Sequence, residues 1–155
     1  MDLDRPSRFS ATKPKILQDI FNRIQQKRHR STILLVEDDD ILRKGYAEYL
    51  GSAGFKIVEA ENGLVALDFL ATQKIDLIIM DVFMPVLDGL STLARIRISS
   101  DIPVIMFSSV TNESTIAALK RHGIYKFISK LALEDLLTSV KTVLAESRIS
   151  ETVYA

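Results

Sequence analysis

Short apolar runs recur along the chain from Ser31 onward, separated by longer stretches in which apolar residues follow a helical spacing. Each run is rich in branched aliphatic residues and too short for a helix, so each predicts a buried strand. The five predicted strands are Ile33–Val36, Lys56–Val58, Leu77–Met80, Val104–Phe107 and Phe127–Ile128. Their starts lie 21 to 27 residues apart, which leaves room for one helix between successive strands.

The stretches between and after the strands carry amphipathic helical stripes. Their apolar positions are Ile41, Leu42, Tyr46, Ala47 and Leu50; Leu64, Leu67 and Ala71; Leu90, Leu93, Ala94 and Ile98; Ile116, Ala117 and Leu119; and Leu133, Leu136, Val140 and Leu144. Asn62 and Asp88 stand where side chains cap helix starts, and Gly51, Gly54 and Gly123 stand where helices end. Strands alternating with helices predict an α/β fold, a parallel sheet with helices on both faces. Right-handed crossovers favour the strand order 2-1-3-4-5.

A separate amphipathic pattern precedes the strands. Residues 1–13 are polar, and from Pro14 an N-terminal amphipathic helix is predicted, with its apolar stripe at Ile16, Leu17, Ile20, Phe21 and Ile24. A helix this short is marginal alone in water, so its apolar face needs a partner. We expect a homodimer through residues 14–28 or packing on the rest of this chain; a partner protein, a membrane surface and disorder are the alternatives, and a membrane is disfavoured because the apolar face is small.

Charge divides the chain at the same place. Residues 1–30 hold eight Lys and Arg against three Asp, whereas the remaining 125 residues hold twelve Lys and Arg against seventeen Asp and Glu. Together with the strand and helix pattern, this division predicts a basic N-terminal extension at residues 1–30, a folded domain at 31–147 and a C-terminal tail at 148–155. No nucleic-acid recognition motif accompanies the basic residues, so a nucleic-acid partner is not expected.

Composition excludes several classes of protein. The chain has no cysteine, which excludes a disulfide framework and a thiolate metal site. No apolar run approaches the roughly 20 residues of a membrane helix, and residues 1–30 lack the apolar segment of a secretory signal. A cytoplasmic protein is the expectation.

Acidic residues follow two of the predicted strands. Glu37-Asp38-Asp39-Asp40 comes directly after the first strand and Asp81 directly after the third. These strands are neighbours in the proposed order, so their carboxylates should converge at one edge of the sheet. Asp39 and Asp40 are explained by the start of a helix, where carboxylates suit the dipole. For Glu37, Asp38 and Asp81, mutual repulsion calls for a cation, and an oxygen-only set favours Mg²⁺ when a phosphate joins the shell.

Two further polar residues end strands at the same edge. Ser108 ends the fourth strand and Lys130 follows the fifth. An aspartate can act as a nucleophile toward phosphorus, and phosphoryl transfer mainly needs its charge neutralised. A hydroxyl, a lysine and Mg²⁺ around Asp81 would supply that neutralisation.

Four segments together resemble the signature segments of response-regulator receiver domains. They are Ile33-Leu-Leu-Val-Glu-Asp-Asp, Asp76-Leu-Ile-Ile-Met-Asp-Val-Phe-Met-Pro-Val-Leu-Asp-Gly, Ile102-Pro-Val-Ile-Met-Phe-Ser and Phe127-Ile-Ser-Lys. The resemblance covers about residues 31–147 and implies a flavodoxin-like fold of the chemotaxis-regulator type. As an ordered set these segments are far more specific than any one motif.

The resemblance implies a role for each residue of the site. Asp81 matches the phospho-acceptor. The implied Mg²⁺ ligands are Asp38 directly, Glu37 through water, Asp81, and the backbone carbonyl of Phe83. Ser108 and Lys130 match the phosphate-sensing pair, and Phe127 matches the aromatic switch residue. The sequence departs from the family at Leu131, where a cis proline is usual, and at Ser109 and Ile124, where alanine is usual.

The function implied is phosphoryl acceptance in a two-component system. The donor would be a histidine kinase or a histidine phosphotransfer protein, and the output a protein contact through residues 113–147 to an unknown downstream target. A phosphorelay intermediate and an unphosphorylated structural receiver remain alternatives. We expect no enzyme activity beyond Mg²⁺-assisted phosphoryl acceptance and slow self-dephosphorylation, because Phe83 and Val110 are apolar where the family flanks the water path.

Two other classes fit less well. A dehalogenase-like phosphatase also uses an aspartyl nucleophile, but Phe83 occupies the position of its second aspartate. A flavin-binding module of the same fold needs a first loop that accepts phosphate, and the acidic Glu37–Asp40 loop would repel it.

Overall fold

The computed structural model describes residues 14–20 and 30–153, with the side chains of 151–153 excepted. The chain divides into two units, residues 1–30 and 31–155.

The first unit contains the beginning of the predicted N-terminal helix. Residues 15–20 are helical, and the Leu17 N–H donates to the Pro14 carbonyl at 2.8 Å. Ile16 and Leu17 are exposed. Phe21 and Ile24 lie outside the described residues, so self-association through residues 14–28 stays a prediction, which the mass of the protein in solution with and without residues 1–30 would test.

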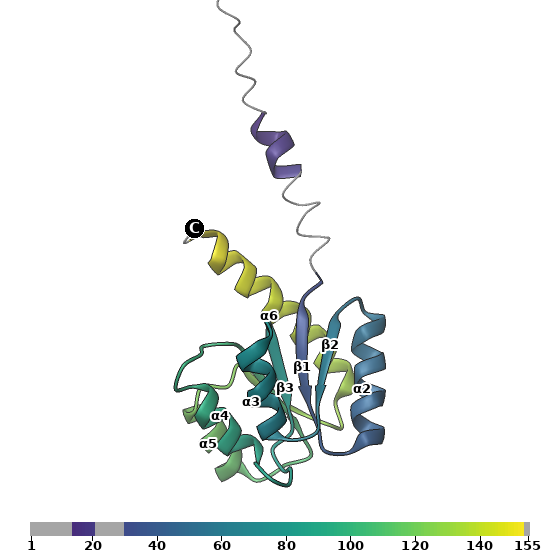
Figure 1. Ribbon diagram of the computed structural model, residues 1–155, viewed down its shortest axis with the longest axis vertical. Coiled ribbons are helices and arrows are strands. Elements are labelled where there is room, and N and C mark those ends of the chain that lie inside the picture. Colours follow the sequence, from purple (N-terminus) through teal and green to yellow (C-terminus); the bar gives the residue numbers. More distant parts are fainter. Residues whose placement is uncertain (1–13, 21–29, 154–155) are drawn as a thin grey trace, which may run out of the picture. The chain divides into compact units, whose positions relative to one another are not determined.

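Residues 31–153 form a five-stranded parallel sheet covered by five helices (Figure 1). The strands are β1 Thr32–Val36, β2 Lys56–Ala60, β3 Leu77–Met80, β4 Val104–Ser108 and β5 Lys126–Ser129. The helices are α2 Asp40–Ser52, α3 Gly63–Thr72, α4 Gly89–Ile96, α5 Glu113–Arg121 and α6 Leu133–Val153. The strand order β2-β1-β3-β4-β5 confirms the predicted order 2-1-3-4-5.

The sheet is apolar on both faces because helices cover both. Every residue of β1, β3 and β4 is buried, as expected for central strands of a doubly covered sheet. Side chains alternate between two cores. One core packs against α3, α4 and α5 and includes Leu34, Val36, Ile78, Met80, Val104 and Met106. The other packs against α2 and α6 and includes Ile33, Leu35, Leu77, Ile79, Ile105 and Phe107.

Helix starts follow the predicted capping residues. The side chain of Asn62 accepts the Val65 N–H at the start of α3, and that of Asp88 accepts the Ser91 N–H at the start of α4. Asp39 caps α2 in the same way. These bonds satisfy backbone donors that a helix start leaves without partners.

Helix ends are predicted less well. Gly54 and Gly123 follow α2 and α5 with positive φ of 99° and 78°, where glycine avoids the penalty of a Cβ atom. Gly51 is a correction, because it lies inside α2. The last helix was expected to end near residue 147 but continues to Val153, since neither glycine nor proline interrupts residues 148–153.

Four large apolar residues assigned to the helical stripes are exposed: Leu42 and Leu64 at 39% and 43%, and Ile41 and Ile98 at 83% and 84%. Ile41 lies in the first turn of α2, and Ile98 lies beyond the end of α4. Among the described residues, no helix is long and apolar enough to cross a membrane.

Candidate metal and phosphoryl-acceptor site

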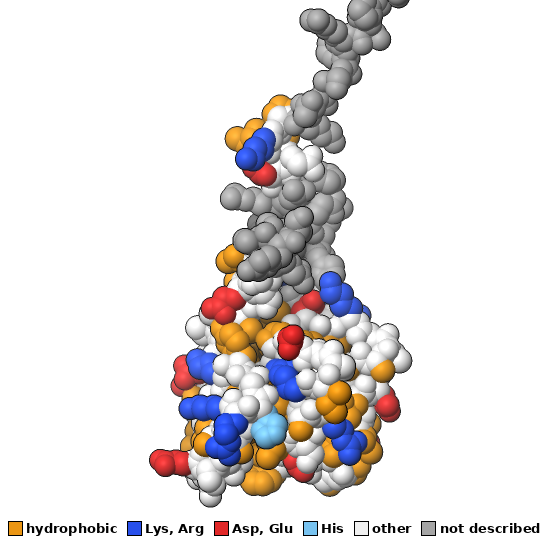
Figure 2. Space-filling model, turned by 90° about the vertical axis from the view of Figure 1, so that its left-hand side faces the viewer, with side chains coloured by type: hydrophobic (Ala, Val, Ile, Leu, Met, Phe, Trp, Pro, Cys, Tyr) orange, Lys and Arg blue, Asp and Glu red, His pale blue; other side chains and the backbone are white. Residues whose placement is uncertain are grey.

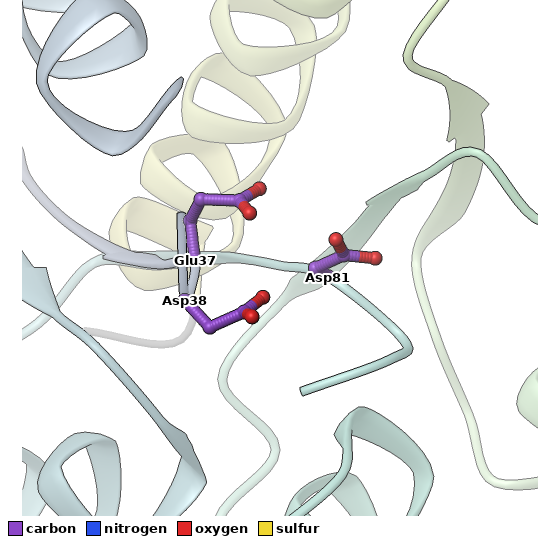
Figure 3. A group of neighbouring side chains, drawn as sticks. All are labelled: Glu37, Asp38 and Asp81. Carbon is purple, nitrogen blue, oxygen red and sulfur yellow. The ribbon is translucent and has the colours of Figure 1, made fainter. Parts of the chain in front are cut away.

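The acidic residues converge where the parallel strands β1 and β3 end. Val36 pairs with Met80 at the last position of the β1–β3 register, so the residues that follow, Glu37 and Asp81, leave the sheet side by side. Figure 3 shows the Glu37 and Asp38 side chains extending toward Asp81. One carboxylate oxygen from each of the three lies within 4.8 Å of the others. The predicted carboxylate cluster is therefore present.

Asp81 is held by three donors. Its Oδ1 accepts the Ser108 hydroxyl at 2.5 Å and the Val82 N–H at 2.6 Å, and its Oδ2 pairs with the Lys130 Nζ at 2.5 Å. The residue is 8% exposed. Its carboxylate is fixed in direction but still reaches solvent, as a group that meets an external reactant must.

Lys130 bridges two carboxylates. Its Nζ lies 2.6 Å from Glu37 Oε2 and 2.5 Å from Asp81 Oδ2. Burial by itself would lower the pKa of Lys130, but the hydrogen bonds and charges of Asp81 and Glu37 outweigh it and hold the pKa above its ordinary value. The ammonium is therefore charged throughout the physiological pH range.

Glu37 is the most enclosed of the three carboxylates, at 2% exposed. Burial raises the pKa of Glu37 above its ordinary value, although the hydrogen bond from Lys130 opposes this. The negative charge of Asp81 adds to the rise in the pKa of Glu37.

The donor set fits a magnesium ion. Within the described residues, Glu37, Asp38 and Asp81 bring three carboxylates against the single ammonium of Lys130, which leaves an excess of two negative charges when all are ionised. Asp38 is exposed and can offer its oxygens to an ion that keeps several waters, as Mg²⁺ does.

The other predicted site residues occupy different surroundings. The Phe83 side chain is 68% exposed, while Val110 is buried in the core with Val82 and Met84. Phe127 is half-buried on β5, where it pairs with Met106 of β4 and packs against the core under α5.

The loop that carries Lys130 is a tight turn. The Ala132 N–H donates to the Ser129 carbonyl at 2.9 Å, and the Leu131 N–H to the Ser129 hydroxyl at 3.2 Å. None of the described peptide bonds is cis, so the Lys130–Leu131 bond is trans. Leucine, unlike proline, has an N–H to donate, and the turn uses it. The Leu131 side chain is 93% exposed.

A strained turn lies in the loop after Asp81. The Leu87 N–H donates to the Pro85 carbonyl at 2.8 Å, which closes a three-residue turn around Val86. Val86 has φ of 71° and is 72% exposed. A β-branched residue at positive φ is costly, because its Cβ crowds the neighbouring carbonyl.

We expect Val86→Gly to stabilise the protein by about 0.5–1 kcal/mol. Relief of the positive φ gains roughly 1–2 kcal/mol, and the added freedom of glycine in the unfolded chain returns roughly 0.5–1 kcal/mol. Urea unfolding measures the difference. Val86→Ala is the control because it keeps the Cβ atom; if alanine stabilises as much as glycine, backbone strain is not the cause.

Sequence reasoning missed two residues that touch the site. Gly89 donates its N–H to the Val82 carbonyl at 2.7 Å, and a Cβ atom there would collide with the Asp81 carbonyl oxygen. Arg43 donates to the Glu37 carbonyl at 2.8 Å. The Asp-Gly pair after the third strand was a sequence signal for Gly89. Arg43 had no such signal, because a side chain that binds a backbone carbonyl leaves no pattern in the sequence.

Comparison with known proteins places the chain in a family. Residues 33–141 match the response regulator receiver domain. The sensor kinase/phosphatase CqsS of Vibrio cholerae is 34% identical over 118 residues, covering 74% of this chain and 17% of that protein. The response regulator MprA of Mycobacterium sp. is 31% identical over 121 residues, covering 77% of this chain and 53% of that protein.

Solved structures agree. A receiver protein from Pseudomonas putida is 30% identical with a TM-score of 0.71, covering 74% of this chain and 98% of that one. The chemotaxis protein CheY4 of Vibrio cholerae is 27% identical with a TM-score of 0.70, covering 74% and 99%.

This chain therefore belongs to the response regulator receiver domain family, whose members accept a phosphoryl group in two-component signalling. It spans about half or less of the length of the two curated relatives described above.

Proposed function

We propose that residues 31–147 form a receiver domain in which Asp81 accepts a phosphoryl group. The observation that carries the proposal is the environment of the Asp81 carboxylate, which Ser108 and Lys130 hold beside Glu37 and Asp38. A carboxylate oxygen of Asp81 attacks the phosphorus, the bond to the donor atom breaks, and the donor leaves with the electron pair of that bond.

The neighbouring residues lower the barrier by binding charge. Lys130 already lies 2.5 Å from Asp81 Oδ2, and the Ser108 hydroxyl can donate to a phosphoryl oxygen instead of to Asp81 Oδ1. We propose that Asp38, Asp81, the backbone carbonyl of Phe83 and, through water, Glu37 would hold Mg²⁺, which would supply positive charge to neutralise the phosphoryl oxygens.

The phosphoryl donor is proposed to be a protein histidine. Members of this family work with histidine kinases or histidine phosphotransfer proteins, and one relative of this chain is named a sensor kinase/phosphatase. A cytoplasmic location agrees with such a donor. The kinase and the downstream target are set by surfaces that family membership does not specify.

We propose that the signal leaves through the face formed by α5, β5 and α6, residues 113–147. Ser108 connects this face to Asp81, because movement of its hydroxyl toward a phosphoryl group changes the space beside the β4–β5 pair that carries Phe127. Two side-chain hydrogen bonds reach α6 from this part of the chain: from Tyr125, just before β5, the hydroxyl donates to Glu146 at 2.8 Å, and from β5 the Lys126 Nζ donates to Ser139 Oγ at 3.0 Å. The side of the protein that carries α4 and α5 mixes basic, acidic and apolar side chains (Figure 2).

Incubation with Mg²⁺ and a small acyl phosphate tests the proposal. The intact mass should rise by one phosphoryl group, and amide spectra should change in β5 and α6 as well as beside Asp81. No gain in mass would contradict the acceptor role. Spectral changes confined to the neighbourhood of Asp81 would contradict the output face and leave the acceptor role standing.

A further inference from the structure

Arg43 joins three elements behind the acidic loop. Its guanidinium is largely buried, with the side chain 11% exposed. Nη1 donates to the Glu37 carbonyl at 2.8 Å, Nη2 pairs with Asp40, and Nε lies 3.5 Å from Glu59 Oε2. The loop after β1, the first turn of α2 and the end of β2 are thus held by one side chain.

The contact with the Glu37 carbonyl matters because of where that oxygen sits. It belongs to the peptide group that links Glu37 to Asp38, and a peptide group is planar. Fixing its oxygen therefore fixes the plane from which both residues depart, and so limits the directions open to two carboxylates that converge on Asp81. A guanidinium is suited to this task, since its rigid fork can serve a carbonyl and two carboxylates together.

We propose that Arg43 is a positioning residue for the metal site: by holding the Glu37 carbonyl, it orients the Glu37–Asp38 peptide and presents the Asp38 carboxylate to Mg²⁺. This inference rests on the proposed metal site. Arg43 itself does not touch the ion or the phosphoryl group.

The direction in which Mg²⁺ affinity changes when Arg43 is removed distinguishes a positioning role from an effect of its charge. A guanidinium near a cation site repels the cation, so removing it should tighten Mg²⁺ binding if charge were all that mattered. Loss of positioning acts in the opposite direction, because residues that orient metal ligands typically contribute about 10–100-fold to metal affinity.

The test is a Mg²⁺ titration of the full chain, followed by amide chemical shifts. We expect Arg43→Met to bind Mg²⁺ about tenfold more weakly than the wild type. Lys44→Met is the matched control, since Lys44 is the next residue on α2, is exposed, and loses the same charge on substitution. Its affinity should equal that of the wild type or be slightly higher. Asp38→Ala serves as the reference for loss of a ligand.

Arg43→Lys covers the case in which Arg43→Met does not fold, as judged by thermal unfolding. It keeps the charge, but an ammonium cannot reproduce the fork, so we expect weaker Mg²⁺ binding here too. The inference is overturned if Arg43→Met binds as tightly as Lys44→Met, or if Arg43→Lys binds as tightly as the wild type. If Asp38→Ala also binds as tightly as the wild type, the proposed metal site itself is wrong and the inference falls with it.

Discussion

Asp81→Asn should abolish phosphorylation by a small acyl phosphate and leave the protein folded. The amide is close to the carboxylate in shape, but it is not a nucleophile toward phosphorus. Its oxygen can still accept the Ser108 hydroxyl and the Val82 N–H, which now reach Asp81 Oδ1 at 2.5 and 2.6 Å. Lys130 keeps Glu37 at 2.6 Å, so no charge is left buried without a partner, and stability should change by no more than about 1–2 kcal/mol.

The measurement is intact mass after incubation with Mg²⁺ and the donor, with thermal unfolding to confirm the fold. Asp88→Asn is the matched control. It makes the same chemical change seven residues along, and asparagine caps a helix as well as aspartate does, so this variant should gain one phosphoryl group like the wild type. Labelling of Asp81→Asn at the wild-type level would move the acceptor to another carboxylate, with Glu37 and Asp38 the neighbouring candidates.

Much of the fold can be predicted from the apolar runs and the amphipathic stripes of the sequence. The central strands are continuous apolar runs because helices cover both faces of the sheet, and this composition separates them from amphipathic helices. Ile41 shows where such reasoning fails. It continues the stripe of α2, but the first turn of that helix lies beside the loop after β1, so the side chain finds no core to enter and is 83% exposed.

For the site, the sequence predicts which residues converge but not which atoms the long side chains bind. That Glu37 and Asp81 meet follows from parallel strands ending at one edge of the sheet, and the β1–β3 register places them side by side. The partners of the long side chains do not follow, because lysine and arginine have many rotamers and several acceptors within reach. Lys130 bridges Glu37 and Asp81, and Arg43 binds a backbone carbonyl. The turn at Leu131 was not predicted either. The family usually has proline at this position, and the turn here uses the Leu131 N–H, which proline lacks.

The lifetime of the phosphoryl group is the second large effect we expect. Hydrolysis requires a water in line behind the phosphorus; the water oxygen bonds to phosphorus, the Asp81–phosphorus bond breaks, and inorganic phosphate leaves. A polar side chain that orients this water would lower the barrier. In this family the residues two beyond the acceptor and two beyond the hydroxyl residue flank the water's path, and here they are Phe83 and Val110, neither of which can hydrogen-bond a water.

The burial of Phe83 and Val110 decides which of the two should be replaced. Val110 is buried in the core, so Val110→Glu would bury a carboxylate and destabilise the protein for reasons unrelated to hydrolysis. Phe83 is 68% exposed, and its replacement should leave the fold intact. Ser109 is exposed next to Ser108, and its hydroxyl is a nearby group with the chemistry to hold a water in place of the missing side chains.

We therefore expect slow self-dephosphorylation in the wild type and decay about tenfold faster in Phe83→Asn, because one hydrogen bond of roughly 1–1.5 kcal/mol to the attacking water corresponds to that factor. The phosphorylated fraction is followed by intact mass after the donor is removed. Val86→Asn is the matched control, since it places the same side chain at another exposed position of the same loop and should decay like the wild type. Ser109→Ala shows whether that hydroxyl contributes. Equal decay of the wild type and Phe83→Asn would mean that Phe83 does not limit access of water.

A slow wild-type rate would suit a domain that passes its phosphoryl group to a second histidine or keeps a lasting signal. A partner's imidazole brings its own aligned nucleophile to the phosphorus and does not need an oriented water.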